Sequence, residues 1–123
     1  MIKNTEIIWL EKPESHDYVA AQNYLSLLFD KKTTTAYVNN LKIAAMVEYK
    51  AKDIFRASAL PLLGIANSHV AKDKKKIASK IKLSPILLVR DSNNGKVIIA
   101  DGYHRMCAVY FYNEDAIIPC QII

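Results

Sequence analysis

"PILLVRDSNNGKVIIADGYHRMCAVY", residues 85–110, carries the clearest structural signals in the chain. Two apolar runs flank the tetrapeptide Ser92–Gly95, and an Asn-Gly step between apolar runs is typical of a β-hairpin. Gly102 interrupts the second run, and the apolar spacing after it is that of a helix. The stretch therefore predicts a hairpin whose second strand passes directly into a helix over 103–112.

The segments on either side of this stretch predict a small α+β domain, with a mixed sheet and flanking helices. The first third of the chain is expected to be helical, with a cap at Ser15 or Asp17 and a buried stripe of Ala20, Tyr24 and Leu28. We expect strands over 7–10, 47–50 and 116–123, and helices over 18–29, after a cap at 33–35, over 53–58 and over the lysine-rich segment from residue 70.

Length and composition favour one compact unit. A chain of 123 residues, 51% of them hydrophobic, is long enough for one core. We divide it into an N-terminal helical extension, 1–46, and a domain over 47–123. The apolar runs are far shorter than the roughly 18 residues that cross a bilayer, and the first residues lack the apolar segment of a secretory signal. We therefore expect a cytoplasmic protein with no membrane contact.

The two cysteines, Cys107 and Cys120, lie in apolar sequence and lack the spacing of metal ligands. Free cysteine is among the most buried residue types, and a cytoplasmic compartment keeps thiols reduced. We predict two buried thiols without a redox role, and no protein metal site.

The net charge of +5 is concentrated in "AKDKKKIASKIK", residues 71–82. This segment is the obvious contact for an anionic partner, including nucleic acid. The spacing of Val70, Ile77 and Ile81 equally predicts an amphipathic helix whose lysines only form its solvated face. The lysines that a nucleic acid would contact are Lys72, Lys74, Lys75, Lys76 and Lys80.

The segment "DGYHR", 101–105, is the strongest candidate site. The first N–H groups of a helix have no intrahelical partner and lie at the positive end of its dipole, so they bind anions. Gly102 leaves room for close approach, Arg105 offers a planar fork of donors, and His104 can donate, accept or transfer a proton. Asp101 can accept a proton. In the alternative interpretation Asp101 is only a helix cap, and His104 and Arg105 are ordinary surface residues.

Residues 47–123 resemble the ParB/sulfiredoxin superfamily. The resemblance rests on a "P-I-x-V" strand, a hairpin and a Gly-x-x-Arg-x-x-Ala helix, which 102–108 match in full. It implies a ParB/sulfiredoxin-like fold and a nucleotide or phosphate ligand at Gly102, His104 and Arg105. Arg56 looks like the arginine that sulfiredoxins place near their nucleotide, and Lys72 lies on the helix that would flank the same pocket.

Two departures narrow what the resemblance implies. Sulfiredoxins carry their reactive cysteine immediately before the His-Arg pair, where this chain has Tyr103, so we expect no sulfinic-acid reduction. Cys107 lies on the helix and cannot take its place. The DNA-binding and dimerisation segments of partitioning proteins are not found in these 123 residues, so we do not expect a partitioning clamp. The extension over 1–46 lies outside the resemblance and is a candidate lid, dimer surface or partner dock.

Our leading hypothesis is a nucleotide- or phosphate-binding protein, acting as a sensor, a small phosphotransferase or a nucleotide hydrolase. His104 and Asp101 are the candidate catalytic residues, and Glu48 is a further candidate acid. A nucleoside triphosphate would bring Mg²⁺ held mainly by phosphate oxygens and water. The alternative is a non-enzymatic module that binds nucleic acid or protein through the lysine-rich helix.

Overall fold

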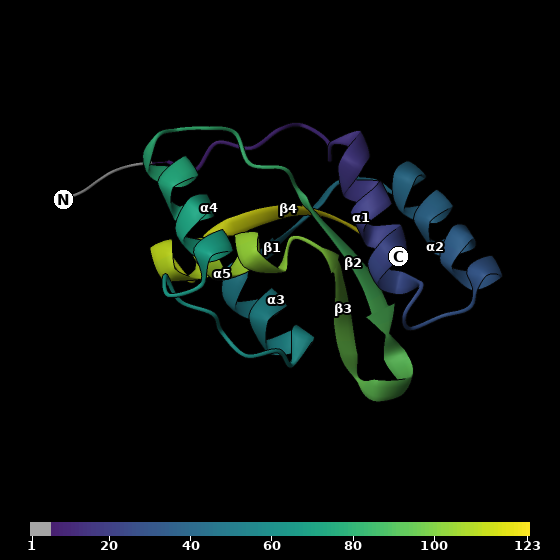
Figure 1. The fold of residues 1–123 in the computed structure, drawn as a ribbon. Helices are drawn as coiled ribbons and strands as arrows, with labels where there is room; N and C mark the ends of the chain where they lie inside the picture. Colours follow the sequence, from purple (N-terminus) through teal and green to yellow (C-terminus); the bar gives the residue numbers. More distant parts are fainter. Residues whose placement is uncertain (1–5) are drawn as a thin grey trace.

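The computed structural model describes residues 6–123, which form helices packed on a mixed sheet and confirm the α+β class (Figure 1). The helices are α1 (Ser15–Leu25), α2 (Lys31–Ile43), α3 (Ala51–Ser58), α4 (Ser68–Ala78) and α5 (Tyr103–Tyr112). The strands are β1 (Val47–Lys50), β2 (Ile86–Asp91), β3 (Lys96–Asp101) and β4 (Ile117–Ile122). No helix within 6–123 is both long and apolar enough to cross a membrane.

The sheet has the strand order β1-β4-β2-β3. β4 runs antiparallel to β1 and parallel to β2, while β2 and β3 form the predicted antiparallel hairpin. A single 3₁₀ turn, Ser92–Asn94, connects the hairpin strands, and Gly95 closes it at a φ of 64°, a conformation that favours glycine. The Asn-Gly signal was therefore a correct guide to this hairpin.

Each face of the hairpin is covered by a different helical layer. On β2, Ile86 and Leu88 pack with α3, α4 and α5, whereas Leu87 and Val89 pack with α1 and α2. This alternation is the period of two expected for a strand buried on both faces. The N-terminal helices thus form one complete layer of the fold, on the side of the sheet opposite α3 to α5 (Figure 1).

The predicted buried stripe of α1 is wrong by one residue. Ala20, Tyr24 and Leu28 are exposed, and α1 instead buries Asp17, Ala21 and Leu25. Hydrogen bonds to Asp17 account for this orientation of α1. Its carboxylate accepts from the Glu14 N–H and from the hydroxyl of Ser84, a residue that precedes β2. A stripe inferred from apolar residues alone misses a helix that is anchored through a buried carboxylate.

A buried glutamine ties this layer to the central strand. Gln121 on β4 accepts a hydrogen bond from the Tyr18 hydroxyl and donates one to the Ala44 carbonyl at 2.8 Å. The predicted cap of α2 at 33–35 is also corrected, because Asp30 caps this helix by accepting from the Thr33 N–H at 2.7 Å. The two hydrogen bonds of Gln121 connect the N-terminal helical layer to β4.

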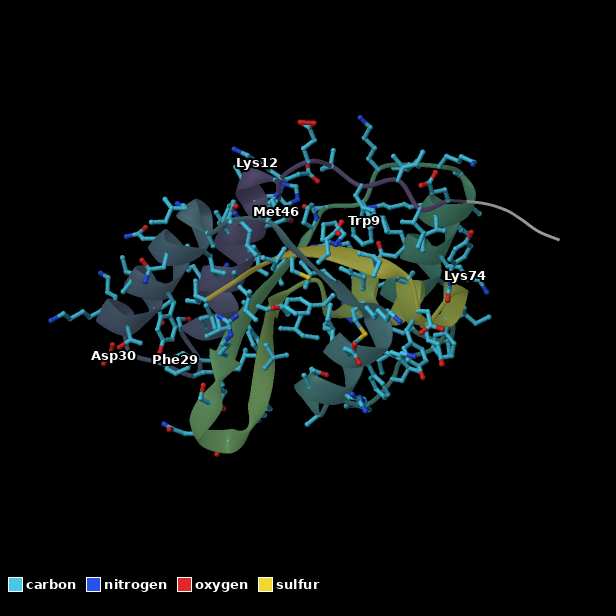
Figure 2. The ribbon with its side chains drawn as sticks, turned by 180° about the vertical axis from the view of Figure 1, so that it is seen from behind. Trp9, Lys12, Phe29, Asp30, Met46 and Lys74 are labelled. Carbon is cyan, nitrogen blue, oxygen red and sulfur yellow. The ribbon has the colours of Figure 1, made fainter. Side chains whose placement is uncertain are left out.

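The predicted strand over 7–10 is reduced to one bridge. Trp9 lies beside Leu83 in an isolated parallel pair, so this segment crosses the loop that leads from α4 to β2. Figure 2 shows Trp9 and Lys74 on one side of the sheet and Phe29 and Asp30 at the far side of the N-terminal layer. The remaining expected elements are present, with α3 longer than the brief turn that we predicted.

Candidate anion-binding site

The site lies where β3 passes into α5. The β2–β3 pairing shifts register between Leu87 and Leu88, so that Leu87 pairs with Asp101 and Leu88 with Ile99. Such irregularities are common beside functional sites, because they redirect the residues that follow. Here the strand turns at Gly102, and α5 begins with Tyr103.

Gly102 is required by the backbone and by the packing beneath it. Its φ is 106°, and a Cβ at this position would lie 2.7 Å from Ile86 Cγ1 and 3.1 Å from Arg105 Nη2. The sequence predicts that Gly102 allows close approach of a ligand, and the structure adds a reason within the fold itself. Either way, the position accepts no side chain without movement of its neighbours.

The start of α5 has no side-chain cap. The first helical hydrogen bond runs from the Met106 N–H to the Gly102 carbonyl at 2.9 Å, so the N–H groups of Tyr103, His104 and Arg105 precede the helical ladder. The alternative in which Asp101 caps the helix is wrong, because its carboxylate is directed to Arg105 instead. Within residues 6–123 these three N–H groups have no hydrogen-bond acceptor, so they are open to an acceptor from outside the helix.

Arg105 is held in place by the protein itself. Its Nη2 donates to Asp101 Oδ2 at 2.8 Å and to the Pro85 carbonyl at 3.3 Å, and its side chain is 17% exposed. Within 6–123, its Nε is the one buried side-chain nitrogen or oxygen without a hydrogen-bond partner. Burial raises the pKa of Asp101 above its ordinary value, although Arg105 acts in the opposite direction. Arg105 thus orients the strand exit, and one of its donors is unused.

One face of α4 completes the site. His69, Lys72, Asp73 and Lys76 recur every three or four residues, which places them on one side of the helix, and all four line a cavity of about 200 Å³ together with residues 101–105. Lys72 has no carboxylate within 4.0 Å among the described residues, while Lys76 Nζ lies 4.0 Å from Asp73. The cavity therefore combines three basic side chains with two carboxylates and two imidazoles.

Two histidine rings pack against each other at the cavity. The ring centroids of His69 and His104 are 4.8 Å apart, and those of Tyr103 and His104 are 5.4 Å apart. Burial, and then the neighbouring His69, lower the pKa of His104 below its ordinary value, while Asp73 opposes this shift. His104 is therefore neutral at pH 7 and can accept a proton.

Two predicted site residues are not brought to this cavity. Arg56 lies on the exposed side of α3, where its Nη2 is 3.3 Å from Asp53 Oδ1, and it does not line the cavity. Glu48 lies on β1 and lines a separate groove with Trp9. The predicted Lys72 does line the cavity, together with Asp101, Gly102, His104 and Arg105.

Comparisons with protein-family models, curated proteins and solved structures find no match to this chain. The resemblance to the ParB/sulfiredoxin superfamily therefore stays a prediction.

Sequence reasoning missed His69 and Asp73. The available signal was the polar stripe at 69, 72, 73 and 76, which runs beside the apolar pair Val70 and Ile77. The same stripe separates the lysines, because Lys72 and Lys76 face the cavity while Lys74 and Lys75 do not line it. Among the described residues, no group of three or more His, Cys, Asp or Glu side chains is placed to hold a metal ion.

The cysteines are buried, as predicted. Cys107 and Cys120 are free and have no exposed surface. Burial raises the pKa of Cys107, and it raises the pKa of Cys120 to about 12. A thiol that stays protonated is a poor nucleophile, so neither cysteine has the properties of a reactive thiolate at neutral pH.

Proposed function

We propose that this protein binds a phosphorylated small molecule or nucleotide, with a phosphate group in the cavity between α4 and α5. The observation that carries the proposal is the convergence of open N–H groups at the start of α5 with Lys72 and Lys76. A helix N-terminus and flanking cations both favour a phosphate oxygen. Arg105 also lines this cavity, and its guanidinium is held there by Asp101 at 2.8 Å.

The size of the cavity defines which part of the ligand it would hold. Sites that enclose a whole drug-sized ligand have volumes of roughly 300 to 1,000 Å³. The cavity here, at about 200 Å³, suits one or two phosphate groups, with the rest of the ligand extending toward solvent. His69 lines the cavity and is exposed, and its ring packs against His104.

If the bound phosphate is transferred or hydrolysed, His104 is the proton carrier in our proposal. Its neutral imidazole lines the cavity and can accept a proton from an attacking hydroxyl group or water molecule. Asp101 then has a positioning role, because its carboxylate is bound to Arg105 at 2.8 Å. A triphosphate would bring Mg²⁺ on its own oxygens, with Asp73 as an additional carboxylate lining the cavity.

The test is a thermal-shift screen with phosphate, nucleoside mono-, di- and triphosphates and phosphoamino acids, each with and without Mg²⁺. A ligand that binds only the folded state raises the melting temperature by mass action. We expect a subset of these compounds to raise the melting temperature. A salt without phosphate or sulfate, at equal ionic strength, should not raise it. If none of the compounds stabilises the protein, the proposal is wrong.

The lysines of α4 provide a matched control. Lys72→Gln with Lys76→Gln should weaken the active ligand by roughly tenfold or more, the effect of losing charged hydrogen bonds. Lys74→Gln with Lys75→Gln makes the same charge change on the same helix outside the cavity, and should leave affinity nearly unchanged. Equal loss from both pairs, with a steep salt dependence for an oligonucleotide, would instead support the nucleic-acid module.

A further inference from the structure

A second cavity, separate from the anion site, lies between α3 and the far end of the hairpin. It has a volume of about 410 Å³, which is within the range of small-molecule sites. Leu88, Val97 and Ile122 from three strands line it, and Ile54 and Ala57 of α3 form its helical wall. Its apolar surface belongs to the same sheet face that α4 and α5 cover near the anion site.

The cavity exists because α3 is too short to cover the hairpin. This helix has eight residues and ends at Ser58, where Ala59 takes a left-handed conformation and turns the chain away. The turn between β2 and β3 lies beyond the end of α3 (Figure 1). On the opposite face, α1 and α2 provide longer helices, with eleven and thirteen residues.

Cations without partners lie at this cavity. Arg90 follows Leu88 on the same face of β2 and lines the cavity, as does Lys96 at the start of β3. Neither has a carboxylate within 4.0 Å in residues 6–123, whereas the cavity's own Asp53 is paired with Arg56 at 3.3 Å. Tyr49 and Ser92 add hydroxyl groups.

We infer that this cavity binds a small amphipathic carboxylate, with its apolar body against Leu88, Val97 and Ile54 and its carboxylate on Arg90 and Lys96. The apolar lining recognises a hydrocarbon or aryl body by burial. The guanidinium recognises a carboxylate through paired hydrogen bonds, a geometry that an alcohol or an amine cannot match. The site is independent of phosphate binding between α4 and α5.

The experiment titrates the full chain with octanoate and phenylbutyrate by calorimetry and by amide NMR. Octanol and octylamine serve as uncharged and cationic analogues. We expect saturable binding of at least one carboxylate, at least tenfold weaker binding of octanol and none of octylamine. The shifted amides should lie on α3 and the hairpin end, and inorganic phosphate should not displace the carboxylate. Absence of saturable carboxylate binding, or equal affinity for octanol, would overturn the inference.

Two pairs of variants locate the site. Ala57→Phe fills the cavity from an exposed helical position and should abolish carboxylate binding, while Ala20→Phe makes the same change on exposed α1 and should not. Arg90→Gln should weaken binding by about tenfold or more, whereas Lys31→Gln on α2 should leave it unchanged. Circular dichroism checks that each variant is folded. Equal effects of the paired variants would place the ligand elsewhere.

Discussion

The starts of α1 and α5 differ in how their backbone N–H groups find hydrogen-bond acceptors. At α1 the Asp17 carboxylate is buried, accepts the Glu14 N–H at 3.0 Å and binds the Ser84 hydroxyl. At α5 the first residue follows a glycine without a side-chain cap, and the nearby Asp101 is turned toward Arg105. The two ends lie close enough that the Asp17 carboxylate helps to raise the pKa of Asp101, after burial as the main cause.

The difference distinguishes a helix start whose N–H groups are satisfied by the protein from one whose N–H groups are open to a ligand. A buried carboxylate at a helix start satisfies donors permanently and anchors the helix. Open donors leave the helix less stable by itself but available to an anion. The other helix starts support this distinction: Asn67 caps α4 through the His69 N–H at 2.9 Å, and the first N–H of α3 donates to the Ala116 carbonyl at 2.9 Å. The open start of α5 therefore supports our proposal that the phosphate binds there.

The largest expected effect comes from closing the open end with a side chain. Gly102→Ala adds a Cβ 2.7 Å from Ile86 Cγ1 at a φ of 106°. Backbone strain and overpacking together should cost about 3 kcal/mol or more in unfolding free energy, and phosphate stabilisation should disappear. Gly95→Ala is the control, because its φ of 64° is similar in sign but its Cβ meets nothing within 4 Å. It should cost about 1 kcal/mol, measured by urea unfolding. Equal costs would contradict the packing argument.

The next largest effect is expected from removing the buried Asp17 carboxylate at the start of α1. Asp17→Ala removes one of the two acceptors of the Glu14 N–H, which keeps Ser84 Oγ at 3.2 Å, and leaves the buried Ser84 hydroxyl without an acceptor for its proton. We expect a loss of about 2 to 3 kcal/mol in unfolding free energy, with phosphate affinity retained. Asp115→Ala removes an exposed carboxylate beside Lys52 and should leave the free energy of unfolding nearly unchanged. Loss of phosphate binding in folded Asp17→Ala would show that α1 belongs to the site.

A smaller effect is expected at Arg105, where structure and binding overlap. Arg105→Ala leaves the mostly buried Asp101 without its cation, which should cost about 1 to 2 kcal/mol at pH 7. The variant should recover stability as the pH falls, because Asp101 can then be protonated in the folded state. Denaturant unfolding at several pH values measures this. An unchanged stability would mean that the Asp101–Arg105 pair contributes nothing to the fold.

The smallest expected effect is the acid response of His104. Its pKa in the folded protein lies below the ordinary 6.5, chiefly through burial, so the unfolded chain binds this proton more readily. The contribution of His104 to the unfolding free energy is therefore present above pH 6.5. It is lost as the pH falls from 6.5 through the pKa of His104 in the folded protein. His104→Gln should reduce this part of the acid destabilisation. Bound phosphate favours the imidazolium, so the parent's phosphate affinity should rise on acidification and the variant's should not.

Two outcomes of the His104→Gln substitution would show whether this histidine takes part in catalysis. If His104→Gln keeps affinity but lowers turnover by about 10²-fold to 10⁴-fold, the histidine transfers a proton. If both are retained, it is a structural neighbour of the site. Calorimetry and a phosphate-release assay on the same preparations distinguish these outcomes.

Local signals predicted the hairpin and α5 well, because turn residues and strand alternation act over a few positions. They also found the residues of 101–105, which are neighbours in the chain. They failed where a distant segment decides the outcome. Asp17 is buried because Ser84 reaches it, and His69 belongs to the site because α4 packs across α5. Arg56 was misplaced for the same reason, since only the orientation of α3 shows that it points away from the cavity.

The position of β4 has a consequence for how the chain acquires its structure. β4 follows every other strand in the sequence, yet it lies between β1 and β2 in the sheet. During synthesis the hairpin can form early, whereas β1 has no strand partner until β4 emerges from the ribosome. Such late, long-range pairing is slow. Until β4 is available, the unpaired edges of β1 and β2 are exposed to other chains. The nascent protein is therefore most open to mispairing until β4 has emerged from the ribosome.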